Sequence, residues 1–139
     1  MRLLVLCVAA FGALALVSAA CRNIGETGSG TGISRTTSIE VYQTGGFAGA
    51  DVRYVVDGTV EPQRRSELFD TVGSEAFRAL ADSYTGPGDC SDAYVYTVTA
   101  GYSDGSAKRI TTDDCSPTPQ LVTDVIARSK EIGHRQDRK

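Results

Sequence analysis

The stretch SIEVYQTGGFAGADVRYVV, residues 38–56, consists of two alternating runs around a glycine-rich connection. In both runs apolar side chains occupy every second position, with Ile39 and Val41 in the first and Val52, Tyr54 and Val56 in the second. This period of two is typical of a strand with one buried face. The connection can adopt backbone angles that residues other than glycine avoid, so the stretch predicts a β-hairpin.

The rest of the chain continues the same pattern of short elements. The sequence predicts two further strands, over 94–99 and 108–112, joined by a turn at Asp104-Gly105. Apolar residues at helical spacing predict helices over 62–73 and 75–82, and a third helix from Pro119 to Gly133. The order is ββα-ββα. We therefore predict an α+β fold, with a small antiparallel sheet of about four strands and the helices packed on one face.

The N-terminus has the three parts of an export signal. Arg2 is positive, the apolar run Leu3–Val17 is shorter than the roughly 20 residues of a membrane-spanning helix, and small residues precede Cys21. The order V-S-A-A-C over 17–21 resembles a bacterial lipoprotein signal, in which the cysteine is acylated and the chain is cut before it. The alternative is ordinary cleavage after Ala20, which leaves Cys21 as a free thiol.

With a lipidated Cys21, we predict a protein held to the lipid bilayer in the cell envelope, on the extracytoplasmic side of a bacterial membrane. Residues 1–20 are then the signal peptide, and 21–37 are the lipidated cysteine and a flexible tether rich in Gly, Thr and Ser. The folded domain is predicted over 38–133, with a polar tail over 134–139.

Cysteine usage predicts one disulfide. Of the four cysteines, Cys7 lies in the predicted signal and Cys21 is the predicted lipidation site. The remaining two, Cys90 and Cys115, flank the predicted second hairpin, and an oxidising compartment allows them to pair. In the chain-entropy model such a crosslink contributes about 3 kcal/mol.

Catalytic and metal-binding patterns are weak. The one histidine, His134, lies in the predicted polar tail, and Asp113-Asp114, Asp89 and Asp92 lie where turns and helix caps favour acidic residues. We therefore expect no catalytic residues, no metal and no cofactor. The net charge is −3 and the basic residues are scattered, which argues against a nucleic-acid partner.

Phe47 is flanked by glycines, and two interpretations of it remain open. The ring could fold back onto the core as a plug, or it could stand exposed at the tip of a protruding loop. The second interpretation makes it a contact for a partner.

Over residues 38–128 the sequence resembles the emfourin family, small bacterial inhibitors of thermolysin-like zinc metalloproteases such as protealysin. The resemblance is carried by SIEV at 38–41, TGGFAG at 44–49, AFRAL at 76–80, DAYVYTV at 92–98 and the helix after Pro119. The GGFAG run is the most distinctive of these. The chain adds a lipoprotein-type signal, a long tether and the Cys90/Cys115 pair to the family pattern.

The resemblance implies a non-enzymatic inhibitor that occludes a protease cleft. The contact residues would be Gly45, Gly46, Phe47, Ala48 and Gly49, with Phe47 in the apolar pocket for the residue after the scissile bond. Glu40 and Asp51 lie near this loop in sequence, and a carboxylate there could reach the zinc. The alternative function is an envelope lipoprotein that serves as a binding or scaffold domain without inhibiting a protease.

Overall fold

A computed structural model describes residues 34–86 and 90–138. Thr31–Lys139 forms a compact unit with its own hydrophobic core. The predicted signal peptide, the predicted lipidation site Cys21 and most of the predicted tether lie outside the described residues.

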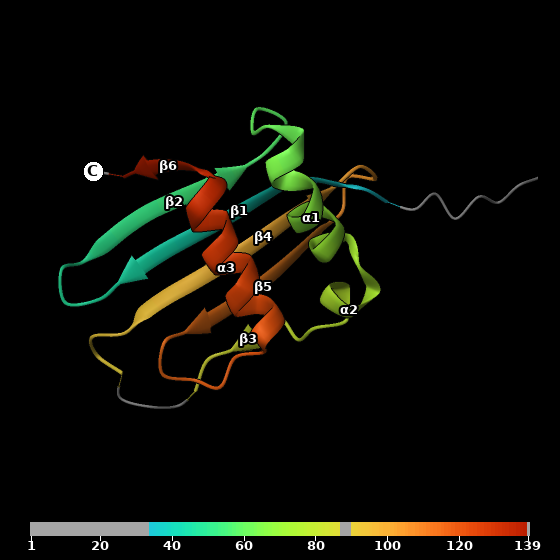
Figure 1. The fold of residues 1–139 in the computed structure, drawn as a ribbon. Helices are drawn as coiled ribbons and strands as arrows, with labels where there is room; N and C mark the ends of the chain where they lie inside the picture. The colour runs from blue at the N-terminus through green and yellow to red at the C-terminus, as the bar shows by residue number, and fades with distance from the viewer. Residues whose placement is uncertain (1–33, 87–89, 139) are drawn as a thin grey trace, which may run out of the picture. The chain divides into compact units, whose positions relative to one another are not determined.

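The described part has an α+β fold with one mixed sheet of six strands (Figure 1). The strand order across the sheet is β3-β5-β4-β1-β2-β6. The strands are β1 Thr36–Gly45, β2 Ala50–Val56, β3 Ser83–Tyr84, β4 Tyr94–Tyr102, β5 Ala107–Asp113 and β6 His134–Asp137. The helices are α1 Pro62–Gly73, α2 Glu75–Arg78 and α3 Gln120–Ile132.

The α+β class is confirmed, but the sheet has six strands and not the predicted four or so. The four predicted strands are β1, β2, β4 and β5, which form the centre of the sheet in antiparallel pairs. The structure adds β3, which pairs with β5 in parallel, and β6, which pairs with β2. β3 has only two residues, too few to show an alternation in the sequence.

The predicted boundaries at both ends of the domain also need correction. Residues 134–137, predicted as a polar tail, form β6, an exposed edge strand that is held to β2 through its backbone. Such a strand buries no side chain and so has no apolar alternation to detect. At the other end β1 begins at Thr36, inside the predicted tether, and the Thr36 hydroxyl donates to the Phe69 carbonyl oxygen at 2.8 Å.

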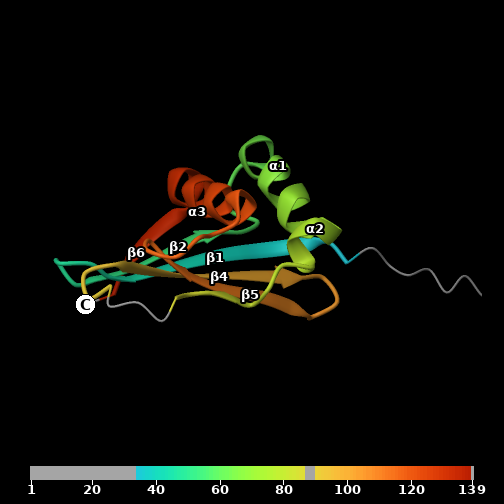
Figure 2. The ribbon, with the colours of Figure 1, turned by 90° about the horizontal axis from the view of Figure 1, so that it is seen from below.

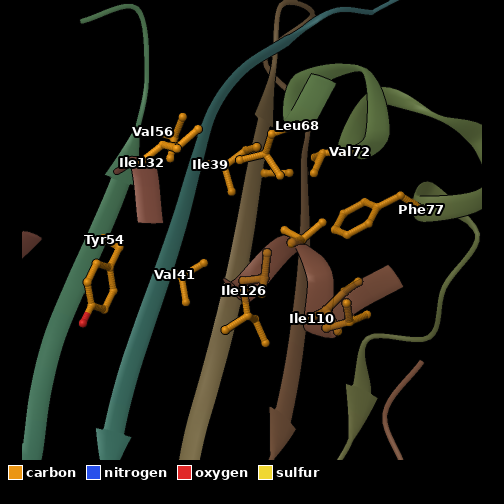
Figure 3. Packing of buried hydrophobic residues seen from close by; sticks show 14 of the residues in the cluster. Ile39, Val41, Tyr54, Val56, Leu68, Val72, Phe77, Ile110, Ile126 and Ile132 are labelled. Atoms are coloured by element: carbon orange, nitrogen blue, oxygen red, sulfur yellow. The ribbon is translucent and has the colours of Figure 1, made fainter. Parts of the chain in front are cut away.

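Helices α1 and α3 cover one face of the sheet (Figure 2). The core lies between these two layers and includes Ile39, Val41, Val56, Ile110 and Ile126 (Figure 3). Fully buried Phe77 packs into the same cluster from the short helix α2. The predicted helix over 75–82 is thus a single turn, whose N-terminus is capped by the Ser74 hydroxyl accepting from the Phe77 N–H at 3.2 Å.

One residue in this core is poorly matched to its surroundings. Ser129 of α3 is fully buried, and its hydroxyl has no hydrogen-bond partner within the described part of the chain. We expect Ser129→Ala to raise the free energy of unfolding by about 1 kcal/mol, because it removes a buried unpaired hydroxyl and favours the helix.

Urea denaturation measures this change, with Ser66→Ala as the matched control. Ser66 is exposed on α1, so its replacement reports helix propensity alone. A Ser129→Ala variant less stable than the Ser66→Ala variant would show that the buried hydroxyl has a partner after all.

Candidate functional site

The candidate site is the turn that joins β1 to β2, at the far left of Figure 1. Gly45 and Ala50 are the last paired residues of the hairpin. The turn between them is closed by a hydrogen bond of 3.0 Å from the Gly49 N–H to the Gly46 carbonyl oxygen. We call residues Gly45–Gly49 the tip.

The Phe47 side chain is exposed at the tip. Its exposed fraction is 94%, and it is the one large apolar side chain that lies exposed in the described part of the chain. This decides between the two interpretations that the sequence left open, because a ring exposed at the tip does not pack into the core. Complete burial of such a ring by a partner would be worth about 2–3 kcal/mol.

Glycine conformations fix the path of the tip. Gly45, Gly46 and Gly49 have φ angles of +83°, +70° and +64°, in the region that L side chains avoid. A Cβ at Gly46 would overlap the Tyr94 ring, whereas a Cβ at Gly49 would meet nothing within 4 Å. The GGFAG sequence therefore encodes a defined turn.

These two glycines give a matched pair of substitutions. Gly49→Ala should cost about 1 kcal/mol of folding stability, the backbone penalty of a positive φ alone. Gly46→Ala should cost at least about 1 kcal/mol more, because the same penalty is joined by the clash with Tyr94. Thermal and urea denaturation measure both variants. Equal destabilisation would mean that Tyr94 does not pack against the tip.

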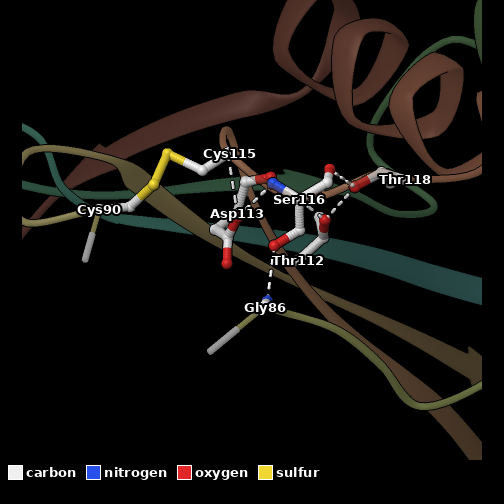
Figure 4. The surroundings of a disulfide bond; sticks show 7 residues. All are labelled: Gly86, Cys90, Thr112, Asp113, Cys115, Ser116 and Thr118. Carbon is white, nitrogen blue, oxygen red and sulfur yellow. Dashed lines mark hydrogen bonds between the residues drawn. A yellow bond between two sulfur atoms is a disulfide. The ribbon is translucent and has the colours of Figure 1, made fainter. Parts of the chain in front are cut away.

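A second loop supports the tip from the side. The Gly46 N–H donates to the Ala93 carbonyl oxygen at 3.0 Å, and the Ala93 N–H donates to the Cys90 carbonyl oxygen at 3.1 Å. Cys90 is bonded to Cys115, with 6.4 Å between the Cα atoms (Figure 4). The predicted disulfide is thus confirmed, and it lies at the same end of the sheet as the tip.

The other side of this crosslink is held by Asp113. Its Oδ1 accepts from the backbone N–H groups of Cys115 at 2.9 Å and Ser116 at 2.7 Å. Hydrogen bonding by the Ser116 side chain, and then by these N–H groups, holds the pKa of Asp113 below its usual value. This carboxylate organises the loop, in the way that turn acids commonly do.

The two carboxylates considered for zinc are placed differently. Glu40 lies five residues before Gly45 on β1, about 17 Å away, and pairs with Arg53 at 3.2 Å. Asp51 lies two residues after Gly49, the last residue of the tip, and its Oδ1 accepts from the Tyr42 hydroxyl at 2.8 Å. This contact raises the pKa of Tyr42. Of the two, only Asp51 lies beside the tip.

His134 makes a polar contact away from the tip. Its Nε2 lies 3.0 Å from the Thr59 hydroxyl, which donates to the Asp57 carboxylate at 2.5 Å. A Ser–His–Asp site instead places the histidine between the carboxylate and the nucleophile. Within 34–86 and 90–138 no three His, Cys, Asp or Glu side chains cluster as metal ligands. No helix of these segments has the length and apolarity needed to cross a membrane.

Sequence reasoning missed the aromatic surroundings of the tip. Tyr94 and Tyr96 occupy alternate positions of β4 on the face that also carries buried Val98, and their ring centroids are 6.3 Å apart. Their spacing of two was a signal that they share a face. The spacing did not show that the helices leave this end of the sheet partly uncovered, so that both tyrosine rings are only half-buried.

Comparison of the chain with protein-family models, with curated proteins and with solved structures gave no match. The fold and the site define a two-layer α+β domain with an aromatic hairpin tip braced by a disulfide loop.

Proposed function

We propose that this domain is a non-enzymatic inhibitor of a thermolysin-like metalloprotease, secreted or in the cell envelope. In this proposal the tip enters the active-site cleft of the enzyme and blocks it, while acylated Cys21 anchors the protein to the membrane. The observation that carries the proposal is the exposed Phe47 ring on a turn whose path is fixed by glycines. The family resemblance supplies the class of enzyme.

Three physical properties of the tip suit it to occlusion. An exposed ring can fill an apolar pocket, such as the one that binds the residue after the scissile bond. The glycines on both sides carry no side chains, so the backbone of the tip can approach the cleft closely. The turn is already ordered by the sheet and by the Ala93 contact, which lowers the entropy lost on binding.

The direction of β1 agrees with a tethered inhibitor. The strand runs from Thr36 to Gly45, so the described chain begins at the end of the sheet opposite the tip. Nine residue steps of about 3.3 Å separate these ends by about 30 Å. An anchor before residue 34 would therefore leave the tip free to meet an enzyme.

The test is cleavage of a peptide substrate by thermolysin in the presence of the compact unit Thr31–Lys139. The proposal predicts strong inhibition at near-stoichiometric ratios, without cleavage of the domain itself. Unchanged cleavage at a tenfold excess of the domain would contradict it. That outcome would favour the alternative, an envelope lipoprotein that binds or scaffolds other proteins.

A further inference from the structure

A groove of about 360 Å³ lies beside α3, on the helix-covered face of the sheet. Tyr96 and Thr112 contribute to it from the sheet, and Ile126 and Lys130 contribute from α3. Its lining is therefore partly apolar, with one cationic side chain, Lys130, and two carboxylates, those of Asp113 and Asp114. This combination is typical of protein contact surfaces, which combine aromatic rings with a few polar groups.

The groove and the tip are parts of one surface. Tyr94 pairs with Gly45 across the sheet, and its ring is the group that a side chain at Gly46 would strike. The next residue on the same face, Tyr96, lines the groove. From the tip toward α3, the surface thus carries first Tyr94 and then Tyr96. A partner whose cleft holds Phe47 would contact these two rings beside it.

Lys130 is the cationic group of this surface. Its ammonium lies 5.4 Å from the ring centroid of Tyr96 and 5.8 Å from that of Tyr54. In the part of the chain that the structure describes, no carboxylate lies within ion-pair distance of Lys130. The two tyrosine rings hold the ammonium in place without neutralising it.

Two carboxylates also line the groove, those of Asp113 and Asp114, and neither lies within ion-pair distance of Lys130. Asp113 accepts from two backbone N–H groups of the disulfide loop. Burial, and then the charge of Asp114, raises the pKa of Tyr96 to about 12, so its phenol stays protonated at neutral pH. The ammonium of Lys130 therefore remains available for an anionic group of a partner.

We infer that this groove is a second contact region for the protease, and that Lys130 binds a carboxylate carried by the enzyme beside its cleft. The inference rests on the proposed function, because the same partner must contact the tip and the groove together. It assigns to Lys130 a role in specificity. Enzymes with an acidic side chain at that position would be preferred over enzymes with a basic one.

The test compares inhibition constants for thermolysin at low and high salt. Lys130→Glu should weaken inhibition about tenfold at low ionic strength, because attraction at the rim becomes repulsion. At 0.5 M salt the loss should shrink to about twofold, since screening reduces the interaction between partly exposed charges. Lys130→Arg should inhibit like the wild type.

Arg109→Glu is the matched control. It makes the same change of charge at an exposed position on the opposite face of the sheet, next to buried Ile110. It should leave inhibition within about twofold of wild type. Equal losses for the two charge reversals, or a Lys130→Glu variant that inhibits like the wild type, would overturn the inference.

Failure of the inference can be told apart from failure of the proposed function. If Phe47→Ala abolishes inhibition and Lys130→Glu does not weaken it, the tip acts alone and only the second contact is wrong. If the wild-type domain does not inhibit thermolysin at all, the proposed function fails, and the inference fails with it. Circular dichroism spectra and melting curves of each variant establish that it is folded.

Discussion

Replacing Phe77 with alanine should lower the free energy of unfolding by about 4 kcal/mol, whereas the same replacement at Phe47 should change it by less than about 0.5 kcal/mol. The Phe77 ring is fully buried between α2 and the core cluster, so its removal leaves a cavity. The Phe47 ring is 94% exposed and contributes almost nothing to packing within the domain. The two substitutions therefore distinguish a loss of folding stability, expected for Phe77→Ala, from a loss of the proposed activity, expected for Phe47→Ala.

Urea denaturation followed by circular dichroism measures both changes. For a domain of this size, a loss of about 4 kcal/mol removes a large part of the total stability, so the Phe77→Ala variant should melt many degrees lower. A Phe47→Ala variant destabilised by 2 kcal/mol or more would show that the ring packs on the domain in solution. It would then contradict the exposed tip on which the proposed function depends.

Loss of the disulfide should have the second large effect on stability. Cys90 and Cys115 are 25 residues apart, and opening a loop of this length should destabilise the domain by about 3 kcal/mol in the chain-entropy model. We expect the Cys90→Ser/Cys115→Ser variant to show this loss in urea denaturation. Reduction of the wild type with a dithiol should give the same midpoint.

The disulfide should also affect inhibition. The disulfide holds the loop that contains Ala93, whose carbonyl oxygen accepts a hydrogen bond from the Gly46 N–H. Without the disulfide this loop is less constrained, so the tip is less ordered before binding. The double variant should therefore inhibit thermolysin more weakly even at temperatures where it is folded. Full inhibition by the double variant would show that the hairpin alone sets the geometry of the tip.

The centre of the fold was predictable because its side chains carry a strong signal. Buried Ile39 and Val41 of β1 and Val52, Tyr54 and Val56 of β2 alternate with exposed or half-buried residues in the sequence as they do in the structure. The helices α1 and α3 were found from apolar spacing, and α1 ends at Gly73 as predicted. These elements are specified by which side chains they bury.

The edges of the sheet could not be predicted in this way. The four residues of β6, His134–Asp137, are all polar and exposed, and only backbone pairing with β2 makes them a strand. β3 depends on contact with β5, about 28 residues later in the chain. Pairing between distant segments through the backbone leaves little trace in a single sequence.

The candidate site was predicted in part. The glycines showed that the turn after Gly45 was unusual, but they allow Phe47 to point to the core or to water with little difference in backbone cost. Which of the two occurs is therefore decided by tertiary packing, and in the structure the Phe47 ring is exposed. The disulfide followed from cysteine number and compartment, while its contact with the tip through Ala93 required the structure.

The inhibition constant of the Phe47→Ala variant against thermolysin, measured beside the wild type, decides whether the tip acts as proposed. Removal of a ring that fills an enzyme pocket should weaken inhibition about 100-fold, and Phe47→Leu, which keeps an apolar side chain, should lose about tenfold or less. The variants should unfold at the same urea concentration as the wild type. A folded Phe47→Ala variant whose inhibition constant lies within twofold of the wild-type value would contradict insertion of Phe47 into the cleft.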